Sequence, residues 1–398
     1  YNIKLYCFIF FTFFGPKLLN VIDLSICISL IIIFLSLRYK FRISKSVYLL
    51  LLSVLFLFTY TIVIGILNLK FNFIFLGKYI RVILAILAIN IIVSNNNYES
   101  KDILNSIINV LLLHALIVIV SSLIWVDLQN VLKWFTNFAL SPSYYRSTGL
   151  TNGYDFSGVL CIFGLVLVSV NQNKLSKLNI LKMIIFIIAS LLTSRFNMIL
   201  LEITLIYLII KNNQISKINK ICFSIVIIFT IVPVLGIFLY STGYRDNFII
   251  TILQKNSYFS IVLERLIYYY ANTNIMDTVA NHFDFSRLTD FQLIFGSMKD
   301  AYADPGYTQY IYNVGIIGLI ITLFFYIQIL IRCIANKIYN HSLMVKHLAE
   351  ILIFFICVLL ILSFKNSYLL ARHVTEIILM VYMLYLKEIK NYKELKNE

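Results

Sequence analysis

Long apolar runs alternate with short polar stretches along the whole chain. Runs long enough, or nearly long enough, to cross a bilayer occupy residues 3–15, 21–37, 47–68, 71–93, 103–125, 154–170, 180–194, 197–210, 221–240, 306–329, 348–363 and 369–386. A crossing helix needs about 20 apolar residues, and the first, seventh and eighth runs are shorter than that. The pattern predicts an all-α integral membrane protein with about 12 transmembrane helices in a single domain, 1–398.

Composition supports this class of protein. Of the 398 residues, 61% are hydrophobic and 13% are charged, whereas a soluble domain carries about 25% charged residues. Twelve helices would use roughly 240 residues, which leaves little room for a soluble domain. The six cysteines stand singly in apolar stretches, so we expect neither a disulfide framework nor a zinc site. The first apolar run lacks a charged n-region and a small-residue cleavage site, so no cleaved signal peptide is expected.

The net charge of +15 would suit nucleic acid, but in a chain this apolar it is typical of the positive-inside bias. Threading twelve spans in order puts five basic clusters on one face: Arg38–Lys45, Lys174–Lys182, Lys211–Lys220, Arg332–Lys346 and Lys387–Lys396. We therefore expect this face and both termini to be cytoplasmic, and no nucleic-acid partner.

The opposite face carries two longer loops, residues 126–153 and 241–305. Loops longer than about 12–15 residues are usually functional. The charges off the cytoplasmic face are mostly arginines, whose planar fork suits phosphate oxygens. The outer face is therefore predicted to bind an anionic, phosphate-bearing ligand presented from the membrane. No internal repeat is evident, which weakens a transporter built from duplicated halves.

Several of these charges have a structural alternative. Lys78 and Arg81 lie three residues apart on one helix face, and pairing with Glu202 or Asp23 would explain them equally well. Arg195 stands at the tip of a predicted short helical hairpin, where an arginine can extend to the interface without binding a ligand.

Of the other charges, some are expected to bind a ligand and others to have a structural role or to be solvated. Arg146 follows a Ser-Pro-Ser-Tyr-Tyr turn, which favours a loop that re-enters the membrane and a functional role. Arg372, His373 and Glu376 are predicted to form a local network, because positions 372 and 376 are one helical turn apart. The residues expected to be solvated are Lys255, His282 and Arg287.

Motifs for nucleotide and metal chemistry are missing from the sequence. There is no P-loop, no GxGxxG and no DxD or DDxxD cluster for a divalent ion. If the ligand carries a diphosphate, arginines rather than a metal must neutralise it, so neither metal nor cofactor is expected.

One group of motifs resembles a known family. The residues are Arg146-Ser-Thr-Gly-Leu-Thr-Asn152, Ser194-Arg195, Arg265, and Phe295-Gly296 followed by Asp304-Pro-Gly-Tyr307 and Gly315-Ile-Ile-Gly318. They resemble the bacterial O-antigen polymerases (Wzy-type polysaccharide polymerases), which share a membrane fold with the O-antigen ligases and, more distantly, with the peptidoglycan-polymerising SEDS proteins. Ligases are expected to have a histidine where Asp304 stands, which argues against a ligase.

The resemblance implies a GT-C-like, O-antigen ligase-like architecture in the bacterial inner membrane, with two larger periplasmic loops. It implies transfer of a growing glycan from undecaprenyl diphosphate to the terminal sugar of an incoming lipid-linked repeat unit, with inversion and on the periplasmic side. A chain-length regulator protein is the other partner that it suggests.

The roles in such a reaction follow from charge and proton transfer. Departure of the diphosphate builds negative charge that preorganised guanidinium groups stabilise, a role assigned to Arg146, Arg195 and Arg265. Asp304 is the expected base for the acceptor hydroxyl. The candidate substrate-binding residues are Arg245, Arg81, Lys78 and Tyr307.

Three alternatives stay open. They are an O-antigen ligase of the same superfamily, a lipid-linked oligosaccharide flippase, and a membrane O-acyltransferase. A flippase typically has short outer loops and two-fold repetition. An acyltransferase is expected to have a histidine or an Arg/Glu pair in an early span, and the first two predicted spans offer only Asp23.

Overall fold

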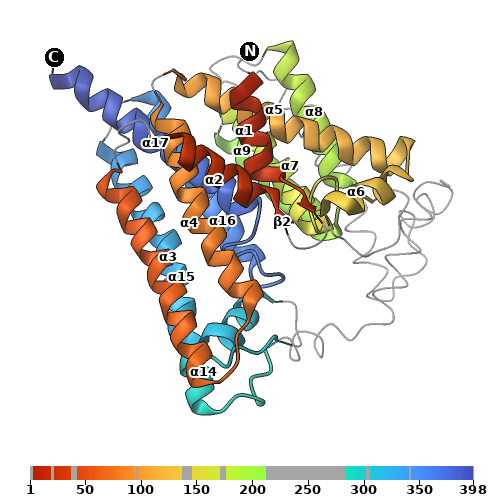
Figure 1. Ribbon diagram of the computed structural model, residues 1–398. Helices are drawn as coiled ribbons and strands as arrows, with labels where there is room; N and C mark the ends of the chain where they lie inside the picture. Colours follow the sequence, from red (N-terminus) through yellow and green to blue (C-terminus); the bar gives the residue numbers. More distant parts are fainter. Residues whose placement is uncertain are drawn as a thin grey trace.

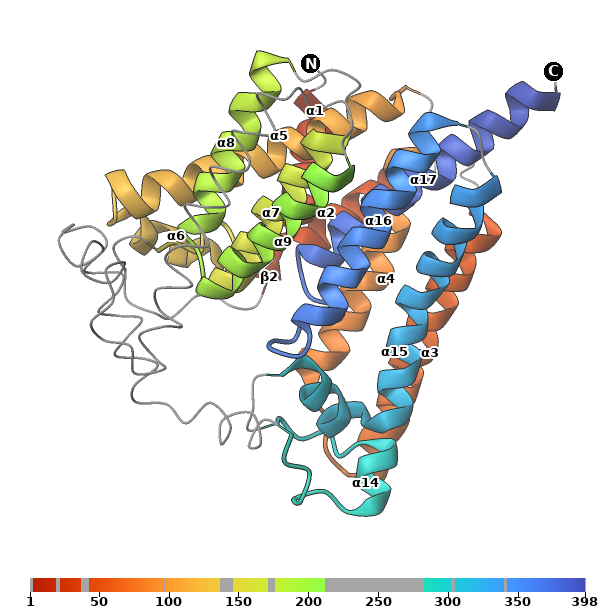
Figure 2. The ribbon, with the colours of Figure 1, turned by 180° about the vertical axis from the view of Figure 1, so that it is seen from behind.

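A computed structural model of the protein describes residues 3–18, 22–36, 43–95, 97–136, 146–170, 176–211, 283–301, 305–339 and 342–397. Within these ranges the chain is almost entirely helical, with one antiparallel sheet of two very short strands, β1 (Lys17–Leu18) and β2 (Ile22–Asp23). Figures 1 and 2 show the helices from opposite sides.

The helices follow the apolar runs closely. Their bounds are α1 (Ile3–Phe14), α2 (Leu24–Ser36), α3 (Lys45–Leu67), α4 (Phe73–Ser94), α5 (Ser100–Ile119) with a π-helical turn η1 (Val120–Ile124), α6 (Leu128–Thr136), α7 (Tyr154–Val170), α8 (Lys177–Leu191), α9 (Arg195–Lys211), α14 (Asp290–Phe295), α15 (Gly306–Tyr339), α16 (Leu343–Leu362) and α17 (Val374–Asn397). Every predicted run overlaps a helix except 221–240, which lies outside the described residues.

Five helical stretches of the described chain are long and apolar enough to cross a membrane: Lys45–Leu67, Phe73–Ser94, Ser100–Ile124, Gly306–Ala335 and Leu343–Leu362. They indicate an integral membrane protein. Four further apolar helices are shorter: Ile3–Phe14, Leu24–Ser36, Tyr154–Val170 and Phe196–Ile209. The predicted total of twelve crossings stays a prediction, as does the arrangement of the two larger loops.

Polar side chains begin several of the helices. Ser44 caps α3 by accepting from the Val47 amide at 3.4 Å, and Asn72 caps α4 by accepting from the Ile74 amide at 3.1 Å. Such caps satisfy backbone donors that have no partner inside the helix. The sequence therefore marks the helix starts as well as the apolar runs.

Several basic clusters lie at one end of the helix bundle, which we call the basic end. Arg332 donates to the hydroxyl of Ser46, which follows Lys45 at the start of α3. The Tyr385 hydroxyl donates to the Arg332 carbonyl oxygen at 3.0 Å, and Lys387 donates to the Tyr98 carbonyl oxygen at 2.7 Å. The start of α3, the end of α15 and the second half of α17 are thereby brought together.

Helices α1 and α2 form a short hairpin. Their described parts are about 18 and about 20 Å long, which is less than a hydrocarbon core of about 30 Å. The antiparallel pairing of Lys17 with Asp23 reverses the chain between them (Figure 1). Since Leu5 in α1 lines a cavity at the basic end with Tyr98 and Lys182, the strand end of the hairpin lies inside the bundle.

Helix α15 bends sharply at Gly315. Its φ of 68° and ψ of −178° are not helical, and a Cβ there would lie 2.3 Å from the Ile294 carbonyl oxygen, so only glycine fits. On either side of the bend, Tyr310 donates to the Leu369 carbonyl oxygen at 2.7 Å and Tyr326 accepts from the Leu370 amide at 2.9 Å. A straight helix would separate the two tyrosines by about 24 Å, so the first part of α15 folds back toward the second.

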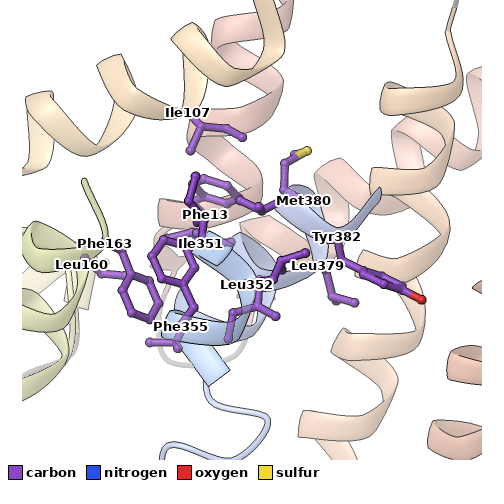
Figure 3. Packing of buried hydrophobic residues seen from close by; sticks show 14 of the residues in the cluster. Phe13, Ile107, Leu160, Phe163, Ile351, Leu352, Phe355, Leu379, Met380 and Tyr382 are labelled. Atoms are coloured by element: carbon purple, nitrogen blue, oxygen red, sulfur yellow. The ribbon is translucent and has the colours of Figure 1, made fainter. Parts of the chain in front are cut away.

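The core is continuous through the bundle and surrounds α7. Every residue from Ser157 to Val170 is buried, as expected of a helix that is apolar on all sides. Phe163 stacks on Phe355 of α16 with ring centres 3.7 Å apart, and Figure 3 shows this contact beside Leu160 and Ile351. The start of α7, where Tyr154 and Asp155 lie, is therefore fixed by close packing on α8 and α16.

Replacing Gly164 with valine tests this packing. A Cβ at position 164 would lie 2.3 Å from the Phe186 ring, so Gly164→Val should destabilise the protein by about 1–3 kcal/mol through overpacking. The measurement is thermal unfolding of the purified protein in detergent. Gly77→Val is the matched control, because nothing lies within 4 Å of a Cβ at Gly77. Equal losses in the two variants would contradict the close contact between α7 and α8.

Candidate functional site

Residues 363–373, which join α16 to α17 and which we call the connecting segment, lie at the centre of the candidate site. Two of its non-glycine residues have a positive φ, Leu370 at 49° and His373 at 72°. Such conformations are uncommon and tend to gather where function requires them. The connecting segment contacts the α1–α2 hairpin, α4, α7 and the start of α15, so it joins the elements that carry the candidate residues.

Two cations of α4 attach to the connecting segment. The Lys78 ammonium lies 3.4 Å from the Ser367 hydroxyl and 4.3 Å from the centre of the Phe75 ring. Arg81 donates to the Leu370 carbonyl oxygen at 2.9 Å and forms an ion pair of 3.0 Å with Glu376. The sequence had offered Glu202 and Asp23 as partners for these cations. Glu376 lies 295 positions further along the chain than Arg81, so no local pattern could have indicated it.

A second ion pair joins the connecting segment to the α1–α2 hairpin. Arg372 lies 3.0 Å from Asp23, with both side chains about nine-tenths buried, and it also donates to the Gly15 carbonyl oxygen. Arg372 and Glu376 do not form an ion pair with each other, and each instead pairs with a residue of another element, Asp23 of β2 or Arg81 of α4. The two pairs nevertheless interact electrostatically, as expected of a local network. Taking one partner away would leave a buried charge without its counter-ion.

Aromatic stacking reinforces the same contact. The Phe14 ring lies between two imidazoles, 5.0 Å from His114 and 5.4 Å from His373. His114 Nδ1 accepts from the Leu150 amide at 3.2 Å, and its Nε2 lies 3.1 Å from the Ser157 hydroxyl. The end of α1, the middle of α5 and the start of α7 are thus packed into one unit.

Arg146 lies beside the start of α9. Its Nε donates to the Thr193 carbonyl oxygen at 2.9 Å, and its guanidinium lies 4.1 Å from the centre of the Tyr154 ring. The next amide, of Ser147, donates to the Leu192 carbonyl oxygen at 3.1 Å. Arg146 therefore lies beside the backbone that leads into α9 at Arg195, whose side chain lies outside the described residues.

Residues 147–151 are all buried and do not form an open loop. Ser147 and Thr151 are fully buried, and Leu150 is 5% exposed. The Ser147 hydroxyl lies 2.6 Å from that of Ser121 in η1. This burial agrees with the hypothesis that the chain around Arg146 enters the bundle.

Asp155 connects α7 to the connecting segment. Its carboxylate lies 2.9 Å from the Lys365 ammonium and accepts from the Asn366 amide group at 2.6 Å. Lys365 also lies 5.0 Å from the Phe196 ring of α9. With a side chain 43% exposed, Lys365 is the cation in these contacts that a ligand can approach most easily.

The start of α15 packs against the same segment. The Gly306 amide donates to the Ser363 carbonyl oxygen at 2.9 Å, and a Cβ at Gly306 would lie 2.6 Å from the Asn366 carbonyl oxygen. Tyr307 donates to the Leu360 carbonyl oxygen at 2.7 Å and packs against Phe364 at 4.8 Å. Its hydroxyl is therefore engaged with backbone, and its ring is the part that a sugar could contact.

Three of the predicted site residues contact the connecting segment directly: Lys78, Arg81 and Tyr307. Arg146 contacts Tyr154, the residue before Asp155, whose carboxylate accepts from Asn366 of the segment. The predicted residues Arg245, Arg265 and Asp304 lie outside the described residues, as do Lys255 and His282. Asp304 directly precedes Pro305, where the description resumes one residue before α15.

The connecting segment itself was not identified as the centre of the site from the sequence. The sequence feature that could have indicated the connecting segment is the mostly polar stretch Ser363-Phe-Lys-Asn-Ser367 between two apolar runs. Polar backbone and side chains at such a position need partners from other helices. Within the described residues, no group of three or more His, Cys, Asp or Glu side chains could bind a metal ion.

Comparison with known proteins adds no family to this description. No model of a known protein family matches the chain, and no curated protein matches it. Any assignment of function must therefore be argued from the chemistry of the residues around the connecting segment.

Replacing Glu376 with glutamine tests the role of its ion pair. Glu376→Gln leaves Arg81 buried without its counter-ion, and we expect a loss of about 3 kcal/mol or more in the free energy of unfolding. The measurement is a denaturant titration of the protein in mixed micelles. Glu394→Gln is the matched control, because Glu394 pairs with Lys390 at 3.5 Å on the surface and should contribute less than about 1 kcal/mol. A loss as small as that of the control would contradict a stabilising role for the buried pair.

Proposed function

We propose that the protein is a membrane glycosyltransferase that polymerises lipid-linked repeat units. It takes the growing glycan from a polyprenyl diphosphate carrier, undecaprenyl diphosphate in bacteria, and transfers it to the terminal sugar of an incoming lipid-linked unit. The observation that carries this proposal is the group of cations at the connecting segment, where Lys78 reaches Ser367 and Lys365 pairs with Asp155. Arg146 lies against Tyr154, the residue before Asp155.

The charge of the site favours a phosphate-bearing ligand. Arginine and lysine at membrane depth are unfavourable unless they face a partner or a ligand. Arg81 and Arg372 have buried carboxylate partners, which supports a structural role for both and makes Arg81 a weaker candidate for substrate binding. Within the described residues, by contrast, Arg146 contacts a carbonyl oxygen and an aromatic ring, neither of which carries a negative charge.

The depth of the site favours a ligand carried by a lipid. Arg81 is eight residues beyond the start of α4 at Phe73, or about 12 Å along the helix. A diphosphate attached to a polyprenyl chain reaches this level from the membrane, whereas a soluble nucleotide would have to enter an apolar bundle. The basic end lies at the other end of the helices, which the positive-inside rule places in the cytoplasm. The site would then open toward the periplasm.

The chemistry required is displacement of a diphosphate by a sugar hydroxyl. Negative charge develops on the departing diphosphate, and fixed cations stabilise it without reorganisation. The acceptor hydroxyl needs a base within hydrogen-bonding distance. Asp304, two residues before Gly306 in the sequence, is the candidate, because Gly306 packs against the connecting segment. Attack opposite to the departing diphosphate would invert the anomeric centre.

A ligase and a flippase are the alternatives, and both would bind lipid diphosphates. A ligase of the same superfamily would use the same cations but would attach finished polymer to a different acceptor. A flippase would move the lipid-linked unit without breaking a bond. A polymerase, a ligase and a flippase differ in the glycan that cells accumulate when the protein is missing. One deletion strain can therefore distinguish the three functions.

Deletion of the gene from its own bacterium provides this separation. For a polymerase we expect surface glycan with a single repeat unit, and restoration of long chains by the wild-type gene but not by Asp304→Asn. The measurement is the ladder of surface polysaccharide on a gel, with immunoblots to show equal amounts of protein in the membrane. No repeat at all after deletion would indicate a flippase, unattached polymer would indicate a ligase, and full-length chains with Asp304→Asn would remove Asp304 as the base.

The Arg146→Lys variant tests the guanidinium. Lysine keeps the charge but loses the planar fork, so we expect the rate of chain extension to fall by about 100-fold, the usual loss for one such donor. The measurement is incorporation of purified lipid-linked repeat units by the protein in detergent. Lys101→Gln, an exposed residue at the start of α5, should keep the wild-type rate. A fully active Arg146→Lys variant would contradict diphosphate binding by Arg146.

A further inference from the structure

A cavity of about 590 Å³ lies at the basic end, between the first turns of α5 and α8, and we call it the α5–α8 cavity. Figure 2 shows both helices beside α1. Leu5 of α1 and Val168 of α7 also line the cavity, and none of residues 363–373 does. Its residues have no role in the resemblance or in the proposed mechanism.

The wall that α5 contributes is a polar stripe on an otherwise apolar helix. Four residues at positions i, i+3, i+4 and i+7 line the cavity: Asp102, Asn105, Ser106 and Asn109. This spacing places them on one helix face, whereas Ile103, Leu104 and Ile107 between them are buried in the core. Polar side chains on a helix long enough to cross the membrane are unfavourable unless they meet water or a polar partner.

The two charged groups of the cavity lie at different depths. Asp102 is exposed, two residues after the start of α5. Lys182 of α8 donates to the Asn109 side-chain oxygen at 3.0 Å, which fixes its ammonium at the level of the last residue of the polar stripe. Seven residues separate Asp102 from Asn109, or about 10 Å along α5. The carboxylate therefore stands at the mouth of the cavity and the ammonium deeper inside it.

The cavity opens beside an apolar surface of α8. Leu178 lines the cavity and is also 61% exposed. Leu181, Ile184 and Ile188 are exposed too, and their spacing continues the same face along α8, away from the basic end. A ligand that enters the cavity can therefore be attached to hydrocarbon chains that lie against α8.

We propose that the α5–α8 cavity binds the headgroup of a zwitterionic phospholipid that has a primary ammonium, of the phosphatidylethanolamine type. In such a lipid the ammonium is the outermost group, the phosphate lies below it, and the acyl chains follow. The same order is found in Asp102, Lys182 and the apolar face of α8. The volume is also in the usual range for ligand sites, about 300–1,000 Å³.

The spacing of the two charges suits this headgroup. Charge-assisted hydrogen bonds of about 2.8 Å at each end leave roughly 4–5 Å of the depth, which the two carbons between the nitrogen and the phosphate oxygen can span. A primary ammonium donates three hydrogen bonds, and the side-chain oxygens of Asn105 and Ser106 can accept them. The trimethylated ammonium of choline donates none. The proposal does not depend on any reaction at the connecting segment.

Thermal unfolding and native mass spectrometry of the purified full-length protein in detergent test the proposal. We expect dioleoyl phosphatidylethanolamine to stay bound as one lipid and to raise the unfolding temperature, because a ligand that binds only the folded state stabilises it. Dioleoyl phosphatidylcholine, with the same acyl chains, should do neither. In Asp102→Asn and in Lys182→Gln the affinity for phosphatidylethanolamine should fall at least about tenfold, since each variant loses a charge-assisted hydrogen bond.

Lys177→Gln and Glu394→Gln are the matched controls. Lys177 is exposed in the first turn of α8 and does not line the cavity, and Glu394 belongs to a surface ion pair. Both variants should keep the wild-type affinity for phosphatidylethanolamine.

Four outcomes would contradict the proposal. Equal binding of the ethanolamine and choline lipids by the wild-type protein, a comparison that does not depend on the folding of any variant, would overturn recognition of a primary ammonium. Tighter binding of dioleoyl phosphatidylglycerol would overturn a zwitterionic ligand. Equally tight binding of free O-phosphoethanolamine would overturn the lipid as its source. Wild-type affinity in both Asp102→Asn and Lys182→Gln would overturn the α5–α8 cavity as the site.

Discussion

Non-helical backbone inside an apolar bundle must find all its hydrogen-bond partners within the protein, and this constraint governs the connecting segment 363–373. Arg81 donates to the Leu370 carbonyl oxygen, and Tyr310 and Tyr326 bond to Leu369 and Leu370. The ion pairs of Arg81 and Arg372 compensate the charges that this arrangement buries. Because these partners come from the α1–α2 hairpin, α4, α15 and α17, the position of each helix depends on the same few contacts.

The bend at Gly315 follows from this constraint. Tyr310 and Tyr326 could not both reach the connecting segment from a straight helix, so the first part of α15 must fold back. The bend also brings residues 312–315 against residues 294–298. A single glycine therefore positions both the start of α15 in the candidate site and the chain that follows α14.

The sequence predicted the helices well and their partners poorly. Apolar runs give the position of a helix directly, and for α7 the predicted run 154–170 matches the observed bounds. The first apolar run was already short for a crossing, but the sequence did not reveal that α1 and α2 form a hairpin, because that depends on β1 pairing with β2. The pairs Arg81 with Glu376 and Asp155 with Lys365 join residues more than 200 positions apart, and no helical or strand period relates such positions. Charge at membrane depth indicated candidate residues, but not which of them form ion pairs.

The ion pairs show which part of the excess positive charge is already compensated within the protein. Among the described side chains around the connecting segment, the cations Lys78, Arg81, Arg146, Lys365 and Arg372 face the carboxylates of Asp23, Asp155 and Glu376. Arg81, Lys365 and Arg372 form ion pairs, whereas no described carboxylate forms an ion pair with Lys78 or Arg146. These two cations are therefore the ones best able to compensate the two negative charges of a diphosphate that links two groups. A site in which every cation was already paired would bind such a ligand weakly, so the proposed transferase depends on the cations that stay outside the ion pairs.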